Sequence, residues 1–268
     1  MYDSDKMFPV YGFGAKIWPH DQVCHRFPCN FSEETPQCFR IDGVLEVYKN
    51  CLEHIELWGP TCFAPMIHGV IENAMRDSER LNSAKIDAEI FNSERNLGRQ
   101  NSASCIFNLV RNTAPPMNSQ EHATRNSLSI KEKSLMTTSH SMYNFSSNYH
   151  VLLLITDGII SDLEETKKAI VIAANYPISI IIIGVGSSDF YAMEELDGDD
   201  VRVSYNGVFA TRDIVQFVSL RDFVMSTRGE VNCRAKLAEE VLREIPDQVS
   251  EFMRMAGLKP NDPVSVYV

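Results

Sequence analysis

The sequence predicts an α/β protein with a doubly wound, mostly parallel sheet and helices on both faces. Two uninterrupted apolar runs, at residues 150–156 and 178–186, are typical of strands buried on both faces. A third strand is expected at residues 213–218. Helical patterns lie between and after these strands, and such alternation is typical of a parallel sheet wrapped by helices.

The helices of the C-terminal half are indicated by their boundary residues. Residues 162–175 begin with Asp162 as a predicted N-cap and Glu165 three positions later, a capping-box spacing, and Pro177 follows the end. A short helix is expected at residues 189–196. A long one at 235–255 should be interrupted near Pro246.

The N-terminal part predicts one strand and two helices. Residues 6–13 have a strand pattern, with Pro9 better suited to a strand end than to a strand centre. Residues 41–57 place apolar side chains at helical spacing, and residues 61–75 predict a second helix. One strand and two helices are not a stable unit alone, so this part should share the C-terminal sheet and residues 1–268 should form a single domain.

Residues 78–149 differ in composition from their flanks. They contain thirteen serines and ten asparagines but few large apolar residues, and only residues 81–91 suggest a short helix. Such a segment buries too little surface to offset its ordering entropy. It fits either a linker between two domains or an insertion within one, and the flanks favour a flexible polar insertion.

Composition excludes several classes of function. The net charge of -11 opposes binding to nucleic acid. No apolar run approaches the roughly 20 residues that cross a bilayer, so no direct membrane insertion is expected. Seven scattered cysteines and an N-terminus without signal-peptide features indicate a reduced, cytoplasmic protein.

Two loops are candidate sites, because ligands of parallel sheets bind at the carboxyl ends of the strands. Asp157 and Gly158 follow the first apolar strand, and the carboxylate could either face a cation or cap the turn. Thr61 follows Gly59 and Pro60, and its hydroxyl could either cap the next helix or bind an ion. Taken alone, Asp157 is better explained as a turn cap and Thr61 as a helix cap.

Six strings together resemble the C-terminal von Willebrand A-like domain of the copine family; they lie at residues 2–16, 59–65, 153–158, 180–186, 195–200 and 212–218. The resemblance implies a metal-ion-dependent adhesion site, in which three loops hold Mg²⁺ or Mn²⁺. Thr61 matches the threonine of the second loop and Asp157 the aspartate of the third.

The resemblance also implies departures from the family. In copines the first strand and its ligand loop precede the string that begins at Tyr2, so we expect a partial domain without its first strand and an incomplete metal site. The C2 domains that bind phospholipid in a calcium-dependent way lie further upstream. Calcium binding, phospholipid binding and recruitment to the plasma membrane are therefore expected only through these C2 domains. Residues 78–149 stand where the family has a short connection.

These observations favour a protein–protein interaction module with intracellular protein partners and no catalytic residues. One alternative is a metal-dependent phosphatase- or kinase-like enzyme that uses Asp157 with Asp162 or Asp197, although no nucleophile and base have suitable spacing. Another is a non-functional truncated isoform, whose unpaired apolar strand edges would promote aggregation.

Overall fold

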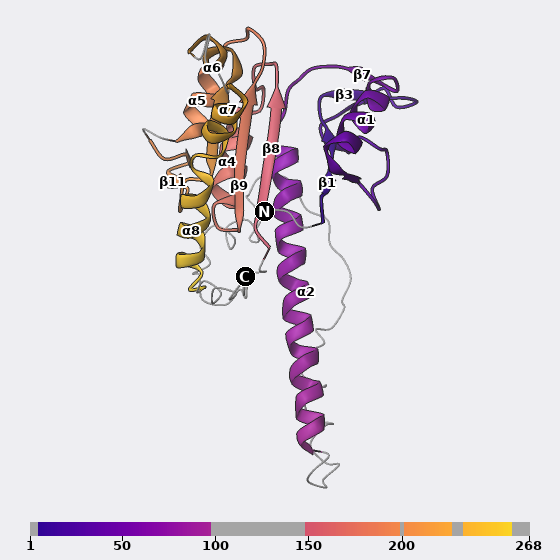
Figure 1. Ribbon diagram of the computed structural model, residues 1–268, viewed down its shortest axis with the longest axis vertical. Coiled ribbons are helices and arrows are strands. Elements are labelled where there is room, and N and C mark those ends of the chain that lie inside the picture. The colour runs from indigo at the N-terminus through magenta and orange to yellow at the C-terminus, as the bar shows by residue number, and fades with distance from the viewer. Residues whose placement is uncertain (1–4, 98–147, 199–200, 227–232, 259–268) are drawn as a thin grey trace, which may run out of the picture. The chain divides into compact units, whose positions relative to one another are not determined.

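The computed structural model describes residues 5–97, 148–198, 201–226 and 233–258, and the side chains of 81–97 are outside this description (Figure 1). Contacts divide the chain into two compact units, Met1–Met75 with Ser147–Val268, and Arg76–Ser146. The first unit contains the sheet. Its α/β architecture with a parallel sheet confirms the predicted fold class and is consistent with a von Willebrand A-like fold.

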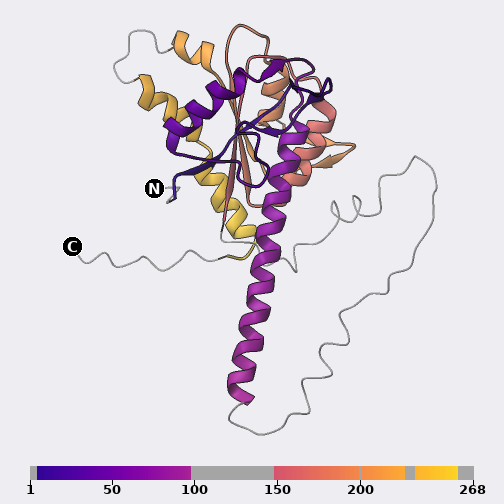
Figure 2. The same ribbon diagram turned by 90° about the vertical axis from the view of Figure 1, so that its right-hand side faces the viewer.

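The central sheet has three parallel strands in the order β12-β9-β8. Figure 2 shows this sheet nearly edge-on, with helices on both sides. These are β8 (His150–Thr156), β9 (Ile178–Gly184) and β12 (Val215–Ser219). All three predicted strands are confirmed. The third begins two residues later than expected, where the Asp213 carboxylate accepts a hydrogen bond from the Val215 amide at 3.1 Å.

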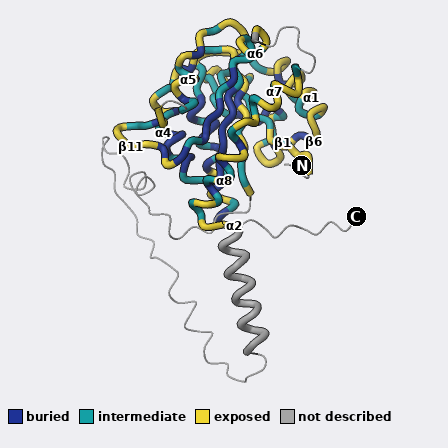
Figure 3. The backbone as a smooth tube through the Cα atoms, turned by 60° about the vertical axis from the view of Figure 1, so that its left-hand side comes forward, coloured by how far each residue is buried: buried dark blue, intermediate teal, exposed yellow. Residues whose placement is uncertain are grey.

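One face of the sheet is covered by three helices: the first turns of α2 (Ala64–Leu97), then α4 (Leu163–Ala173) and α5 (Tyr191–Asp197). Leu154 of β8 and Ile182 of β9 are paired in register and point into this layer, where they are almost fully buried. Figure 3 shows the buried segments concentrated along the central strands.

The opposite face is covered by α7 (Cys233–Leu242) and α8 (Ile245–Met255), which contact β12 and β9 respectively. Ser179 of β9 donates a hydrogen bond of 2.5 Å to Gln248 of α8. The predicted interruption near Pro246 is confirmed, because this residue lies in the first turn of α8. Helix α6 (Leu220–Ser226) follows β12 directly.

Strand β8 is buried on one face only, and the expectation of burial on both faces was wrong for it. Val151, Leu153 and Ile155 are 49%, 51% and 57% exposed. They share a face with Ser179 and Ile181 of β9, which are buried. The difference arises because the covering helices of this face contact β9 and β12 (Figure 1).

The N-terminal part contains short antiparallel strand pairs instead of one long strand. They comprise β1 (Met7–Pro9) with β6 (Gln37–Phe39), β2 (Tyr11–Gly12) with β5 (Phe27–Pro28), and β3 (Ala15–Ile17) between β4 (Val23–Cys24) and β7 (Ile55–Leu57). Pro9 ends β1, as its missing amide predicts. A second small core of Ala15, Phe27, Cys29 and Cys51 lies here.

Helix α1 (Arg40–Leu52) is shorter than the predicted 41–57, because the chain turns into β7, where Ile55 pairs with Ile17. Apolar residues do recur at helical spacing. However, four of them are between 40% and 60% exposed, namely Ile41, Leu45, Tyr48 and Leu52.

Helix α2 continues far beyond the predicted end at residue 75 and includes the expected short helix at 81–91. Residues 78–97 contain alanine, leucine, glutamate, lysine and arginine but neither glycine nor proline, so propensity favours the helix. The flexible stretch therefore does not begin at residue 78. The remainder of the predicted insertion lies mostly in residues 98–147, outside the described residues.

Candidate functional site

The two predicted ligand residues lie close together at the carboxyl end of β8. A Cβ atom placed on Gly158 would be 3.2 Å from the Thr61 hydroxyl oxygen, so the Asp157–Gly158 turn directly adjoins the Thr61 loop. Two hydrogen bonds between Thr61 and Ser161 join these loops. Ser161 N donates to the Thr61 carbonyl at 2.8 Å, and Thr61 N donates to Ser161 Oγ at 3.3 Å. Glycine at position 158 permits this approach.

Asp162 holds the same two loops together by capping helix α2. Its two carboxylate oxygens accept the amide protons of Phe63 at 3.0 Å and Ala64 at 2.9 Å. The Thr166 hydroxyl donates to the same carboxylate at 3.1 Å. The capping box predicted with Glu165 is therefore wrong, since Asp162 serves the neighbouring helix and makes no side-chain cap on α4.

The backbone around Asp157 is fixed, while its side chain is exposed. Ser188 Oγ donates to the Asp157 carbonyl at 2.6 Å, and Val185 N donates to the Thr156 carbonyl at 2.8 Å. Gly158 N donates to the Thr156 hydroxyl at 3.3 Å. These bonds fix the backbone of the turn that adjoins Thr61, and none of them uses the Asp157 carboxylate.

The two residues expected to bind Mg²⁺ or Mn²⁺, Thr61 and Asp157, come from these two adjoining loops. The Thr61 hydroxyl and the Asp157 carboxylate are oxygen groups of the kind that Mg²⁺ prefers, and this ion usually keeps several waters beside one or two carboxylates. The nearby carboxylate of Asp162 is engaged by two amides and a hydroxyl. Within the described residues, no group of three or more His, Cys, Asp or Glu side chains is arranged to hold a metal ion.

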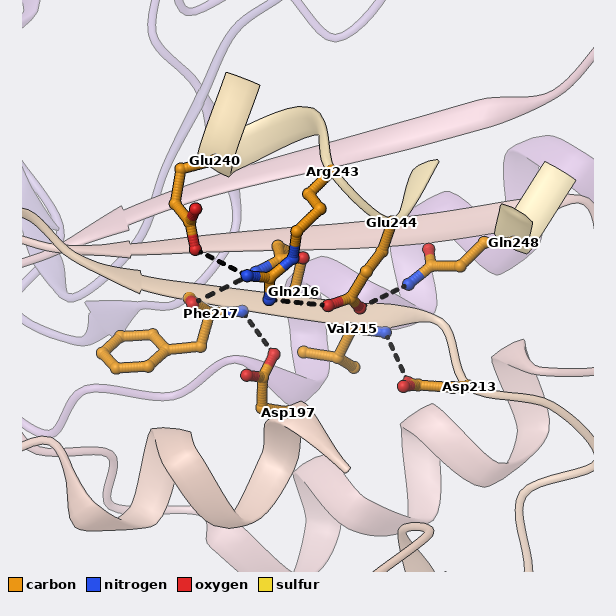
Figure 4. A network of polar contacts seen from close by, with 9 residues as sticks. All are labelled: Asp197, Asp213, Val215, Gln216, Phe217, Glu240, Arg243, Glu244 and Gln248. Carbon is orange, nitrogen blue, oxygen red and sulfur yellow. Dashed lines mark hydrogen bonds and ion pairs between the residues drawn. The ribbon is translucent and has the colours of Figure 1, made fainter. Parts of the chain in front are cut away.

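Asp197, the other carboxylate considered for catalysis, forms a hydrogen bond with strand β12. Its Oδ1 accepts the Phe217 amide proton at 2.5 Å, as Figure 4 shows. The same view shows Arg243 bonded to Glu240 at 2.9 Å and to Glu244 at 3.2 Å. Asp197 thus joins α5 to β12, and Arg243 joins the end of α7 to the start of α8.

Sequence reasoning missed the fully buried Arg212. Its guanidinium donates to five oxygens: the carbonyls of Ala174, Tyr176, Ile178 and Gln248, and the hydroxyl of Tyr149. Burial lowers the pKa of Arg212, while the adjacent Tyr149 opposes that change. The apolar neighbours Ile214 and Val215 were the only signal that this arginine enters the core, so its partners could not be read from the sequence.

Three buried cysteines form a second feature that the sequence did not reveal. Burial, reinforced by Cys51, raises the pKa of the Cys29 thiol to about 12. Burial also raises the pKa values of Cys38 and Cys51. The six cysteines in the described part of the chain are free thiols, and these three are suited to packing rather than to nucleophilic chemistry.

Fold and site together define an α/β protein in which two loops meet at the carboxyl edge of a parallel sheet. The family model described as Copine matches residues 1–86 and 120–261. This chain therefore belongs to the copine family, as the resemblance indicated. Residues 87–119, within the predicted insertion, are outside the match. Among the described residues, no helix is both long and apolar enough to cross a membrane.

Proposed function

We propose that this chain is a protein–protein interaction module of a copine-like protein, built around an incomplete metal-ion-dependent adhesion site and acting on intracellular proteins. The observation that carries the proposal is the contact between the Thr61 loop and the Asp157–Gly158 turn at the ligand-binding edge of the sheet. An exposed carboxylate there can bind a partner's polar group. Membership of the copine family supports the same function.

The use of the neighbouring carboxylates argues against the enzyme alternative. A phosphatase or kinase would need Asp162 or Asp197 beside Asp157 as a nucleophile, base or metal ligand. Asp162 instead accepts the amides that begin α2, and Asp197 accepts an amide of β12. Substrate turnover that is abolished by Asp157→Asn in buffer containing Mg²⁺ would revive the enzyme hypothesis.

The decisive experiment is partner capture with the full chain. Cytosolic proteins bound by the immobilised chain would be compared with those bound by the Thr61→Ala/Asp157→Ala variant, each with Mg²⁺ or with EDTA. We expect saturable capture that weakens in the variant, because both altered groups lie on the proposed binding edge. An identical set of captured proteins with both chains would contradict this location, and no saturable capture would refute the module.

Two further experiments test whether the metal site is incomplete and whether the chain alone binds phospholipid. Titration calorimetry with Mg²⁺ or Mn²⁺ should give only millimolar or weaker binding, because two side-chain oxygens are available. Vesicles containing phosphatidylserine should not retain the chain when calcium is added, since C2 domains supply that response in the family. Micromolar metal binding would show that the site is complete.

A further inference from the structure

A pocket of about 680 Å³ is lined by residues of β3 and β7 and by the residues that follow α1. Its walls come from residues 16–21, Phe31 and residues 53–56. The antiparallel pairing of Ile17 with Ile55 brings these segments together, because the chain leaving β3 and the chain entering β7 meet at one end of the ladder. Nothing in the proposed adhesion site uses this pocket.

Aromatic side chains give the pocket an exposed π surface. Trp18 is 86% exposed and Phe31 is 45% exposed. His54 holds Phe31 in an edge-to-face contact with ring centroids 6.0 Å apart, and its Nδ1 lies 2.8 Å from the Asn50 carbonyl oxygen. Exposed aromatic rings beside a concave surface are typical of binding sites.

The charge around these rings is negative. Lys16 is used within the protein: its Nζ lies 3.0 Å from the Asp21 carboxylate and 4.1 Å from the ring centroid of Trp58. The carboxylates of Glu53 and Glu56 form no ion pair with any residue in the described ranges. Helix α1 ends at this point, and its C-terminal dipole adds further negative potential.

We propose that this pocket binds an arginine or lysine side chain of a partner protein, a specificity that rests on the proposed interaction function. The cation packs on the exposed ring of Trp18 and pairs with Glu53 and Glu56. Lys16 on Trp58 already shows the same cation–π contact within the chain. The carboxylates repel phosphate, so the occupant is a basic protein segment rather than an anionic lipid or a nucleic acid.

Intrinsic fluorescence tests this directly, because Trp18 and Trp58 are the two tryptophans of the chain. The probe is a blocked pentapeptide, glycine-arginine-glycine-arginine-glycine, and the matched control peptide carries glutamine in place of arginine. We expect a saturable change with the arginine peptide that weakens as salt is raised. The variant Glu53→Gln/Glu56→Gln should weaken binding about fivefold or more.

The matched control variant is Glu33→Gln/Glu34→Gln, which removes the same charge from exposed residues outside the pocket and should leave affinity unchanged. Thermal melts confirm that both variants fold.

The proposal is overturned by an equal response to the glutamine peptide, by equal losses in both variants, or by a stronger response to phosphatidylcholine vesicles than to peptide. If captured partners persist after Glu53→Gln/Glu56→Gln, the interaction module stands without this pocket. If the peptide binds but no partner is captured, the pocket stands and the module fails.

Discussion

Arg212 provides the sharpest test of how the sheet is joined to its helices. The substitution Arg212→Met roughly preserves side-chain length and removes every donor from a residue that is 0% exposed. Five oxygens then lose the guanidinium as a donor, which lies between 2.6 and 3.4 Å from them in the native chain. They belong to the end of α4, the start of β9, helix α8 and Tyr149.

The expected loss follows from these contacts. Each lost hydrogen bond costs about 1 kcal/mol, although other donors remain, such as Thr211 Oγ1 for the Ala174 carbonyl and Ile178 N for the Tyr176 carbonyl. Methionine offsets part of the total because no charge has to be buried. We therefore expect the free energy of unfolding to fall by about 3 kcal/mol, a large share of the roughly 5–15 kcal/mol typical of a folded protein. In a domain of this size the melting temperature should fall by about 6–12 °C.

Thermal melts and urea unfolding measure this loss. The control is Arg202→Met, since Arg202 is exposed and makes one bond, to the Thr211 carbonyl at 3.2 Å, so its stability should change by less than about 0.5 kcal/mol. Arg212→Lys should restore little, because one ammonium group cannot reach acceptors on both sides. If Arg212→Met melts within about 2 °C of the native chain, the carbonyls do not depend on the guanidinium and the reasoning is refuted.

Three further predictions concern other described residues. Asp162→Ala should lower the free energy of unfolding by about 1–2 kcal/mol in urea titrations, because Phe63 and Ala64 lose their cap, whereas exposed Asp157→Ala should not. Leu153→Lys should reduce concentration-dependent self-association in sedimentation experiments with little change in stability, and a large loss of stability would mean that this face is covered. Near neutral pH, Cys29 should resist iodoacetamide in the folded chain, as measured by mass spectrometry. Because folding raises the pKa of Cys29 from 9.0 to about 12, the stability that the buried neutral thiol contributes should be lost as pH rises through that interval. Rapid alkylation of Cys29 in the folded chain would contradict the raised pKa, and with it both expectations.

The strands and their order of appearance could be predicted because long apolar runs have few alternatives. Residues 150–156 and 178–184 form strands, as expected, but identical-looking runs differ in burial. Ile181 is 3% exposed while its register partner Leu153 is 51% exposed. An apolar sequence pattern predicts which side chains of a strand are suited to burial. It does not predict which helices pack on the strand, because that depends on contacts between residues far apart in the sequence.

Local signals failed where a distant partner competed for the same group. Asp162 has an N-cap position and a suitable Glu165, yet its carboxylate caps α2, almost one hundred residues earlier in the chain. Spacing alone cannot distinguish these outcomes. By contrast, the hairpin of β10 (Ser204–Tyr205) and β11 (Val208–Phe209) could have been found, because Asn206 and Gly207 are a favoured hairpin turn and both adopt positive φ.

The exposed face of β8 links stability to function. Val151, Leu153 and Ile155 are each about half exposed, so complete burial of all three would contribute about 2–4 kcal/mol. That gain is available to any apolar surface that reaches the strand, including a second copy of the chain. Self-association rises with concentration, whereas binding of a basic segment at the pocket beside β3 depends on Glu53 and Glu56 and weakens with salt. Added salt therefore weakens binding at the pocket but not self-association, because apolar burial is not screened, and this difference separates specific binding from aggregation in a single titration.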